Sequence, residues 1–198
     1  MVYGETGRHP LLIEASISSV RYWLKLNKMD SHRFPKQALD MLKSHPVMSF
    51  PSVSDDWLKN IKDLLYKHGF KSVYINGGTK SEKAFLAILR RKMIDEFKSN
   101  WQTKLTGSDR FATYTSFKQN LHLENYINEI GIKKFRDPFI WMRLGINDLG
   151  INKRYGQTSD LTSKCKFCPN KIEDEVHFIF DCPLYYDVRE KYINPLFS

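Results

Sequence analysis

The chain has little cysteine and no long apolar run. Its three cysteines among 198 residues are an odd number, which is a poor basis for a framework of paired disulfides. No apolar stretch approaches the roughly 18 residues of a transmembrane helix. The first residues, MVYGETGRHPLLIEA, lack the charged segment leading into an apolar one that marks a signal peptide. We therefore expect an intracellular protein, in the nucleus or the cytoplasm, with no membrane partner.

Acidic residues are outnumbered by basic ones. The chain has 22 Asp and Glu against 31 Lys and Arg, which gives a net charge of +9. Such a surplus favours polyanionic partners such as nucleic acid, although it also aids solubility. Hydrophobic residues make up 41% of the chain and aromatic residues 14%, values typical of a folded protein with a core.

Strand signals are scarce, and the apolar pattern is mostly helical. Ile13, Ile17, Val20 and Leu24 recur at helical spacing behind Pro10, which suits the start of a helix. Further helices are predicted at 54–68, 81–104, 109–118, 122–130 and 134–146. The segment GFKSVYING (69–77) is the one strand-like piece.

Four tryptophans recur at core-like positions of these segments: Trp23, Trp57, Trp101 and Trp141. We expect them to fill the interior, because their large rings contribute most when they are buried. A tryptophan exposed within an apolar patch would instead favour protein docking.

All three cysteines lie within KCKFCPNKIEDEVHFIFDCP (164–183), spaced as Cys165-x2-Cys168-x8-His177-x4-Cys182. Four soft or borderline ligands in one short segment are typical of Zn²⁺ in a closed Cys3His site. Such a site staples a polar segment that has little core of its own, and it leaves no coordination position open for catalysis. The sequence therefore predicts Zn²⁺ as the cofactor, rather than three buried structural cysteines beside a surface histidine.

The last two ligands need a break in the helix that carries them. His177 and Cys182 are five residues apart, so on one unbroken α-helix they would point about 140° apart. Pro183 supplies a break, because the residue before a proline is pushed out of the α region. We expect Cys182 at the start of a final helix, PLYYDVREKYI. The carboxylates of residues 173–175 are predicted to orient the ring of His177 through its second nitrogen.

The polar, glycine-containing segment NDLGINKRYGQTSDLTS (147–163) precedes the cysteine cluster and suggests a boundary. The predicted organisation is an irregular helical body at 1–147, followed at 148–198 by a small zinc-stabilised CCHC module with a C-terminal helix. The fold class is mainly α.

The C-terminal segment CKFCPNKIEDEVHFIFDCPLYYDVREKY resembles the zinc-binding module that follows the reverse transcriptase domain in non-LTR (LINE-like) retrotransposons. In that family a Cys-x-x-Cys is followed by an acidic pair, by HFxFxC and by a proline, a tyrosine and an arginine. The matching positions here are Cys165, Cys168, Glu173, Asp174, His177, Phe178, Phe180, Cys182, Pro183, Tyr186 and Arg189. The preceding FIWMRLGINDLGINKRYG resembles the family's linking segment, and VYGETGRHPLLIEASISSVRYWLKL resembles its helical stretch before the module.

The departures from the family are as informative as the match. The polymerase signature places two adjacent aspartates behind an aromatic residue on a hairpin, whereas the Asp55-Asp56 pair of this chain suits a helix N-terminus. Nothing in the sequence places a nucleophile, a phosphate loop or a small-molecule substrate. We expect no catalytic residue and no polymerase or endonuclease activity.

The resemblance implies a non-catalytic module that binds RNA or DNA beside a retroelement polymerase. Between Gly131 and Lys171 the sequence has nine lysine and arginine residues but only three acidic residues. The residues predicted to contact nucleic acid are Arg143, Lys153, Arg154, Tyr155, Lys164, Lys166, Phe167 and Lys171. Lysine and arginine would contact phosphates, while the two aromatic rings would stack on unpaired bases. Two alternatives stay open: a zinc-stapled helical module that docks on protein, and a truncated remnant without selected function.

Overall fold

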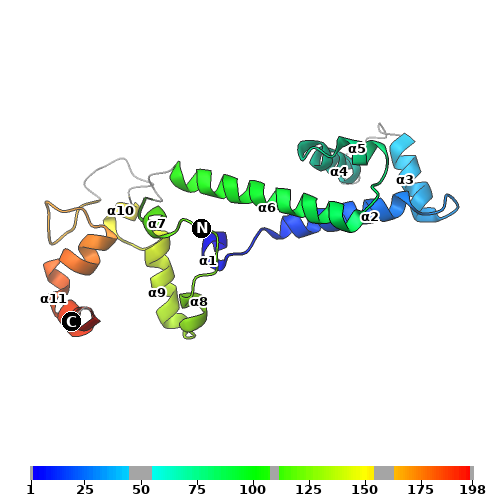
Figure 1. Cartoon of the computed structure of the whole chain (residues 1–198). Helices are drawn as coiled ribbons and strands as arrows, with labels where there is room; N and C mark the ends of the chain where they lie inside the picture. The colour runs from blue at the N-terminus through cyan, green and yellow to red at the C-terminus, as the bar shows by residue number, and fades with distance from the viewer. Residues whose placement is uncertain (1, 45–54, 108–111, 154–162, 197–198) are drawn as a thin grey trace. The chain divides into compact units, whose positions relative to one another are not determined.

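The computed structural model describes residues 2–44, 55–107, 112–153 and 163–196 (Figure 1). These residues are mainly α-helical, which confirms the predicted fold class. Within these ranges the only β-type pairings outside helices are two isolated antiparallel bridges, Thr6 with Leu123 and Lys164 with Ile172. None of the helices in the described part of the chain has the length and apolar character to cross a membrane.

The chain divides into two compact units. The helical unit comprises His9–Trp101, and the terminal unit comprises Met1–Arg8 together with Gln102–Ser198. This division falls elsewhere than the predicted boundary at 147/148, because residues 102–147 group with the cysteine module. Whether 148–198 folds separately stays a prediction.

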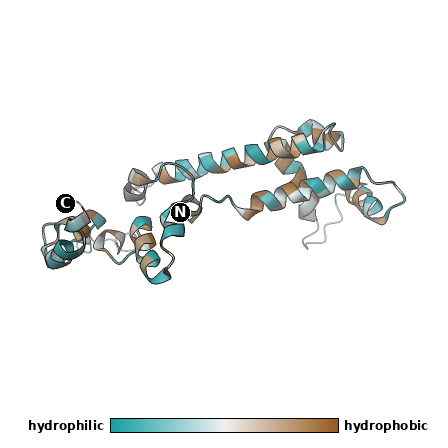
Figure 2. Cartoon of the chain, turned by 60° about the horizontal axis from the view of Figure 1, so that its bottom comes forward, coloured by the Kyte–Doolittle hydropathy of each residue, from teal (hydrophilic) through white to brown (hydrophobic). Residues whose placement is uncertain are grey.

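The described residues of the helical unit form four complete helices and most of a fifth. They are α2 (Leu11–Asn27), α3 (Phe34–Ser44), α4 (Asp55–Lys67), α5 (Lys71–Ile75) and α6 (Glu82–Thr106). The predictions for α2, α4 and α6 are confirmed, whereas α3 was not expected. Along α2 and α6 apolar residues recur among hydrophilic ones (Figure 2), and in α2 they form the stripe read from the sequence.

One hydrophobic cluster holds this unit together. Trp23, Leu24 and Leu89 are fully buried, and the Trp23 ring stacks on Tyr74 with centroids 5.4 Å apart. Burying a leucine side chain stabilises a fold by about 1.5–3 kcal/mol, so these residues supply much of the unit's stability.

The strand predicted at 69–77 is wrong, because Lys71–Ile75 forms the short helix α5. Phe70 and Val73 pack against the core cluster as Tyr74 does. A run of apolar and β-branched residues this short cannot by itself distinguish a strand from a buried helical turn.

The terminal unit contains shorter elements. Its α-helices are α1 (Val2–Thr6), α7 (Ala112–Phe117), α8 (Tyr126–Glu129), α9 (Lys133–Leu144), α10 (Gly150–Lys153) and α11 (Tyr186–Tyr192). A π-helix spans His177–Asp181, and two 3-10 turns span Pro183–Tyr185 and Asn194–Leu196. The helix predicted near 134–146 is confirmed as α9, and α7 confirms the described part of the one predicted near 109–118. Of the helix predicted near 122–130 only the short α8 forms, and residues 122–125 are not helical.

A buried carboxylate fastens the N-terminal segment to this unit. Glu5 is 3% exposed and accepts hydrogen bonds from the hydroxyls of Tyr114, at 2.7 Å, and Tyr126. Arg143 donates from Nε to Glu5 Oε2 at 3.1 Å and from Nη2 to Glu124 Oε2 at 3.1 Å. The backbone N–H of Glu124 also donates to the carbonyl of Glu5. A buried charge of this kind is stable because its partners are all present.

Gly7 makes the close approach of this segment feasible. Its φ is +63°, a conformation that favours glycine, and a Cβ atom placed there would lie 2.4 Å from the backbone nitrogen of Leu123. Both the dihedral angle and the space therefore exclude a side chain.

The expectation that all four tryptophans fill the interior is wrong for one of them. Trp23 and Trp101 are buried, and Trp57 packs against the core cluster. Trp141, by contrast, is 49% exposed on α9.

Candidate metal centre

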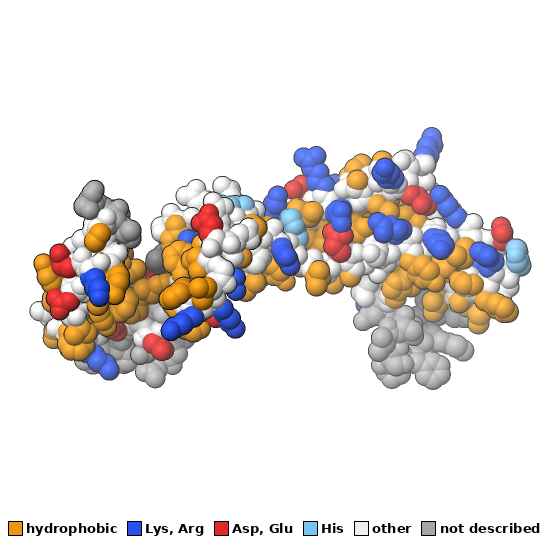
Figure 3. All heavy atoms as spheres, turned by 90° about the horizontal axis from the view of Figure 1, so that it is seen from below, with side chains coloured by type: hydrophobic (Ala, Val, Ile, Leu, Met, Phe, Trp, Pro, Cys, Tyr) orange, Lys and Arg blue, Asp and Glu red, His pale blue; other side chains and the backbone are white. Residues whose placement is uncertain are grey.

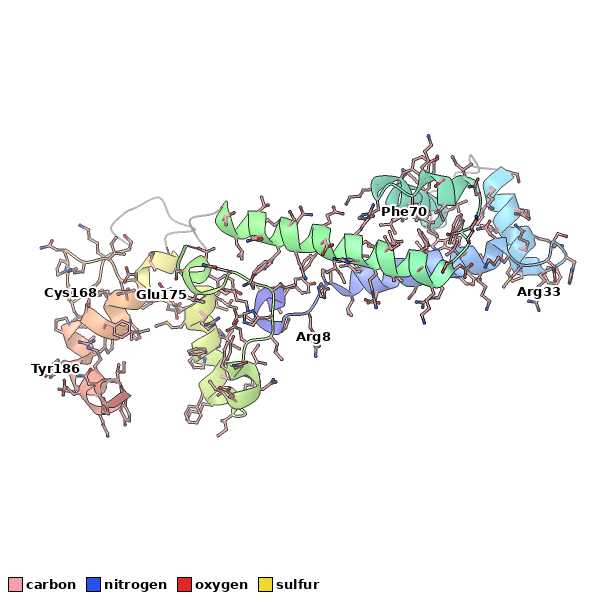
Figure 4. All side chains as sticks on the ribbon, in the orientation of Figure 1. Arg8, Arg33, Phe70, Cys168, Glu175 and Tyr186 are labelled. Carbon is pink, nitrogen blue, oxygen red and sulfur yellow. The ribbon has the colours of Figure 1, made fainter. Side chains whose placement is uncertain are left out.

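The first two ligands are presented by a tight reversal of the chain. Lys164 and Ile172 form an antiparallel bridge, and the N–H of Cys165 donates to the carbonyl of Lys171 at 2.9 Å. The N–H of Lys171 donates in turn to the carbonyl of Cys168 at 2.9 Å. This small ribbon turns Cys165 and Cys168 toward one side, and Cys168 is labelled in Figure 4.

The other two ligands are brought together by the π-helix. The N–H of Cys182 donates to the carbonyl of His177 at 2.7 Å, a bond that spans five residues. Because a π-turn closes its hydrogen bond five residues on, the two residues lie about one turn apart and share a face. The α-helical offset of about 140° is thereby removed.

The predicted break before Pro183 is also present. Cys182 has φ −65° and ψ 121°, which is extended backbone, and Pro183 opens a 3-10 turn that leads into α11. The start of a final helix at this position is therefore confirmed, with its first turn tighter than expected.

The four side chains converge on one point. One ligand atom from each of Cys165, Cys168, His177 and Cys182 lies within 4.8 Å of all the others. The Sγ atoms of Cys165 and Cys182 are 3.9 Å apart. Two sulfurs bound at about 2.3 Å to one tetrahedral ion are separated by about 3.8 Å. This cluster can hold a metal ion.

His177 gives independent support for a cation. It is 5% exposed, and among the described residues neither of its ring nitrogens has a partner at normal hydrogen-bond geometry, although the ring lies near the Cys165 thiol. A buried polar group without a partner costs free energy comparable to a lost hydrogen bond or more. A metal ion in the cluster would give one of these nitrogens a ligand bond.

The pKa values of the Cys165 and Cys168 thiols are shifted in opposite directions. Burial by itself raises the pKa of Cys165, but the backbone N–H groups of Phe167 and Cys168 and the neighbouring His177 ring outweigh it and lower that pKa to about 7. Burial and then the nearby thiols of Cys182 and Cys165 raise the pKa of Cys168 above its ordinary value. Thiolates this close repel one another, and a bound cation would offset that repulsion.

The prediction that the carboxylates at 173–175 orient the His177 ring is wrong. Glu173 Oε2 accepts from the backbone N–H of Gly150 at 2.8 Å, and Glu175, labelled in Figure 4, makes a 3.4 Å contact with the side chain of Asn147. Asp174 Oδ1 accepts from the backbone N–H of His177, not from its ring. Glu173 and Asp174 thus accept from backbone N–H groups of Gly150 and His177 and fix the loop and the helix start instead.

Arg189 is a supporting residue that the spacing argument missed. It is 8% exposed, and its Nη2 donates to the carbonyl of Cys182 at 2.6 Å. This bond holds the ligand-bearing break against α11. In the sequence, Arg189 is marked only by its place seven residues after the last cysteine, a position that matches the family resemblance.

The residues predicted to contact nucleic acid fall into three groups. Four of them are exposed around the reversal: Lys164, Lys166, Phe167 and Lys171. Arg154 and Tyr155, as well as the side chain of Lys153, lie outside the described residues.

Arg143 lies within an ion-pair network of the terminal unit. Its side chain is 16% exposed, its guanidinium is paired with Glu5 and Glu124, and it lies 4.4 Å from the centroid of the Phe117 ring. These contacts give its charge partners within the protein, and its contact with nucleic acid stays a prediction.

Compared with known proteins, the chain matches no family model, no curated protein and no solved structure. The resemblance to retrotransposon reverse transcriptases therefore stands on the residues quoted for it.

Proposed function

We propose that this chain is a non-catalytic nucleic-acid-binding protein whose C-terminal module is stapled by zinc. Three thiolates and an imidazole in a buried cluster form a donor set that suits tetrahedral Zn²⁺. All four positions are filled by protein ligands, so such an ion would stabilise the fold and leave no position for a substrate. This arrangement agrees with the resemblance to the module that follows retroelement polymerases.

The observation that carries the binding proposal is the surface of the reversal. Lys164, Lys166 and Lys171 are exposed there, and the Phe167 ring between the two cysteines is 65% exposed. Cations beside an exposed aromatic ring suit a flexible polyanion with flat bases, because lysine contacts the phosphates and the ring stacks on a base. The net charge of +9 favours the same class of partner.

The first experiment measures metal content and fold together. Elemental mass spectrometry of the purified protein should find one zinc per chain, and Cys168→Ser should lose it together with helical signal from the C-terminal elements. Zinc-free protein with an unchanged fold under reducing conditions would refute the zinc assignment.

The second experiment titrates salt against binding of single-stranded RNA and of duplex DNA. Replacing Lys164, Lys166 and Lys171 by alanine should weaken RNA binding and reduce the salt slope by about 2, since each lost phosphate contact removes about 0.7. The control replaces three exposed lysines of the helical unit: Lys25, Lys59 and Lys80. An equal loss in this control would show non-specific attraction only.

A protein-docking function is the second candidate, and one observation favours it. Apolar side chains form much of the surface over the C-terminal elements, at the left of Figure 3. Val176, Phe180, Leu184 and Val188 are all about half exposed. Large exposed apolar patches mark contact surfaces for other proteins. No RNA or DNA binding at about 50 mM salt, or binding that is indifferent to salt, would favour this function over the first.

A further inference from the structure

Helix α9 has one packed face and one face without a partner among the described residues. On the packed face Arg143 pairs with Glu5, and Phe139 meets the ring of Tyr126 with centroids 4.7 Å apart. Leu144 is buried at the end of the helix. The side of α9 opposite Arg143 is therefore available to something else.

The opposite face carries an aromatic residue and a cation in line. Lys134, Pro138 and Trp141 recur at i, i+4 and i+7, so they lie one above another on a helix. All three are exposed, and Trp141 has 49% of its surface accessible. Phe135, which is 63% exposed, lies about 100° round the helix from Lys134 and is therefore not part of this line.

The charge of this face is positive. Lys134 has no ion pair within the described part of the chain. Lys133 forms an i,i+4 ion pair with Asp137 at 3.9 Å, and its side chain stays 79% exposed. Because Lys134 lies in line with Trp141, this face differs from a purely apolar docking patch. Charge complementarity thus favours a polyanion that also offers flat groups for stacking.

We propose that this outer face of α9, formed by Lys134, Pro138 and Trp141 with Lys133 at its edge, binds single-stranded nucleic acid, with Trp141 as a stacking platform. The proposal rests on the nucleic-acid-binding function and adds a second contact surface to the one around Phe167. The ligand is single-stranded because a base must expose its flat face to stack on a side chain, and base pairs in a duplex cover those faces.

Trp141 also provides the readout. The other three tryptophans, Trp23, Trp57 and Trp101, are buried or packed against the core. A stacked base quenches indole fluorescence, so quenching on binding should come from Trp141. The probe is a single-stranded RNA of about 16 nucleotides of mixed sequence, long enough for a typical single-strand site.

The expected results form a pattern across variants. The unmodified protein should be quenched by the RNA, and Trp141→Phe should lose the quenching while its affinity stays within about twofold, because phenylalanine also stacks. Trp141→Ala should bind roughly 5- to 150-fold more weakly, the range measured for loss of a base-stacking ring. Replacing Lys133 and Lys134 by glutamine should lower the salt slope by about 1.4.

Controls separate a local effect from a folding defect. Phe34→Ala removes a ring that is 87% exposed on α3 of the helical unit, and it should leave RNA affinity unchanged. Each variant should keep its helical circular dichroism and its metal content. Duplex RNA of the same sequence should quench Trp141 far less than the single strand.

The outcomes distinguish this proposal from the function on which it rests. If the alanine variants at Lys164, Lys166 and Lys171 weaken RNA binding while Trp141→Ala does not, the α9 proposal is overturned and the nucleic-acid function stands. If the unmodified protein binds neither single-stranded RNA nor duplex DNA at low salt, the function itself fails. Equal quenching by duplex and single strand would also overturn the stacking role.

Discussion

Replacing Glu5 by glutamine tests whether the buried carboxylate holds the terminal unit together. The change keeps the size of the side chain and removes its charge. The carboxylate accepts from Tyr114 through Oε1 and from Tyr126 through Oε2, and Arg143 reaches both oxygens. Glutamine offers one oxygen and one NH₂ group, so at least one of these donors loses its acceptor.

The magnitude follows from these contacts. A hydrogen bond to a charged group contributes about 1.5–3 kcal/mol, and breaking a buried ion pair costs about 3–5 kcal/mol. Arg143 keeps Glu124 as a partner in the variant, which places the cost near the lower end. We expect the free energy of unfolding of the terminal unit to fall by about 3 kcal/mol. In a unit of about 100 residues this lowers Tm by roughly 12 °C.

The assay must report on one unit at a time. Trp141 is the one tryptophan in the sequence of the terminal unit, and the other three belong to the helical unit. In protein labelled with fluorotryptophan, the ¹⁹F resonance of Trp141 therefore follows unfolding of the terminal unit alone. Urea titrations with this resonance give the free energy directly.

The matched control is Glu14→Gln. Glu14 belongs to the helical unit and pairs with Arg90, but its side chain is about half exposed. The free energy of unfolding of the helical unit should therefore fall by less than about 1 kcal/mol, and that of the terminal unit should not change. A Glu5→Gln variant that unfolds at the same urea concentration as the unmodified protein would refute the assignment of Glu5 as a fastening group.

The same carboxylate predicts a pH dependence. Burial alone raises the pKa of Glu5, but the hydrogen bonds from Tyr126, Tyr114 and Arg143 outweigh it and lower that pKa below its ordinary value of 4.5. A lowered pKa in the folded state contributes stability above pH 4.5 that is lost as the pH falls through the folded value. Glu5→Gln should lose this part of the acid dependence.

Three further predictions concern other parts of the chain. Gly7→Ala should destabilise the terminal unit by about 2–3 kcal/mol in urea titrations, because of its positive φ and its contact with Leu123, whereas Gly78→Ala, which meets nothing within 4 Å, should be close to neutral. Leu89→Ala should destabilise the helical unit by about 2–5 kcal/mol by leaving a cavity in its core. If the urea midpoint reported by the Trp141 resonance also fell in this variant, the division into two units would be contradicted. Zinc affinity, measured by competition with a chelator, should weaken as the pH falls, because the cysteine thiols must lose their protons to bind the metal. A pH-independent affinity would rule out thiolate ligation.

The cysteine spacing largely determined the candidate metal site. Cys165, Cys168, His177 and Cys182 lie within eighteen residues, so local turns suffice to bring them together. The break at Cys182 was also readable, because Pro183 restricts the residue before it whatever the tertiary context. The π-turn was not readable, because no single residue encodes a bond that spans five residues in place of four.

Helix positions were predicted best where the apolar period was long. The stripe along α2 and the length of α6 follow from residues that repeat over several turns. The segment 69–77 failed because its few apolar residues suit either a strand or a helical turn, and contact with the core cluster decided between them.

The sequence by itself determined the helical class, the net positive charge and the identity of the four candidate metal ligands, since composition, period and short spacing are local properties. Only the tertiary structure decided which charges and rings face outward. Arg143 and Glu5 are far apart in the chain, and their pairing arises because residues 2–8 fold against residues 112–144. That pairing leaves only 16% of the Arg143 side chain exposed, while Trp141 lies on the opposite side of the same helix and is 49% exposed, because burial depends on long-range contacts that no local pattern records.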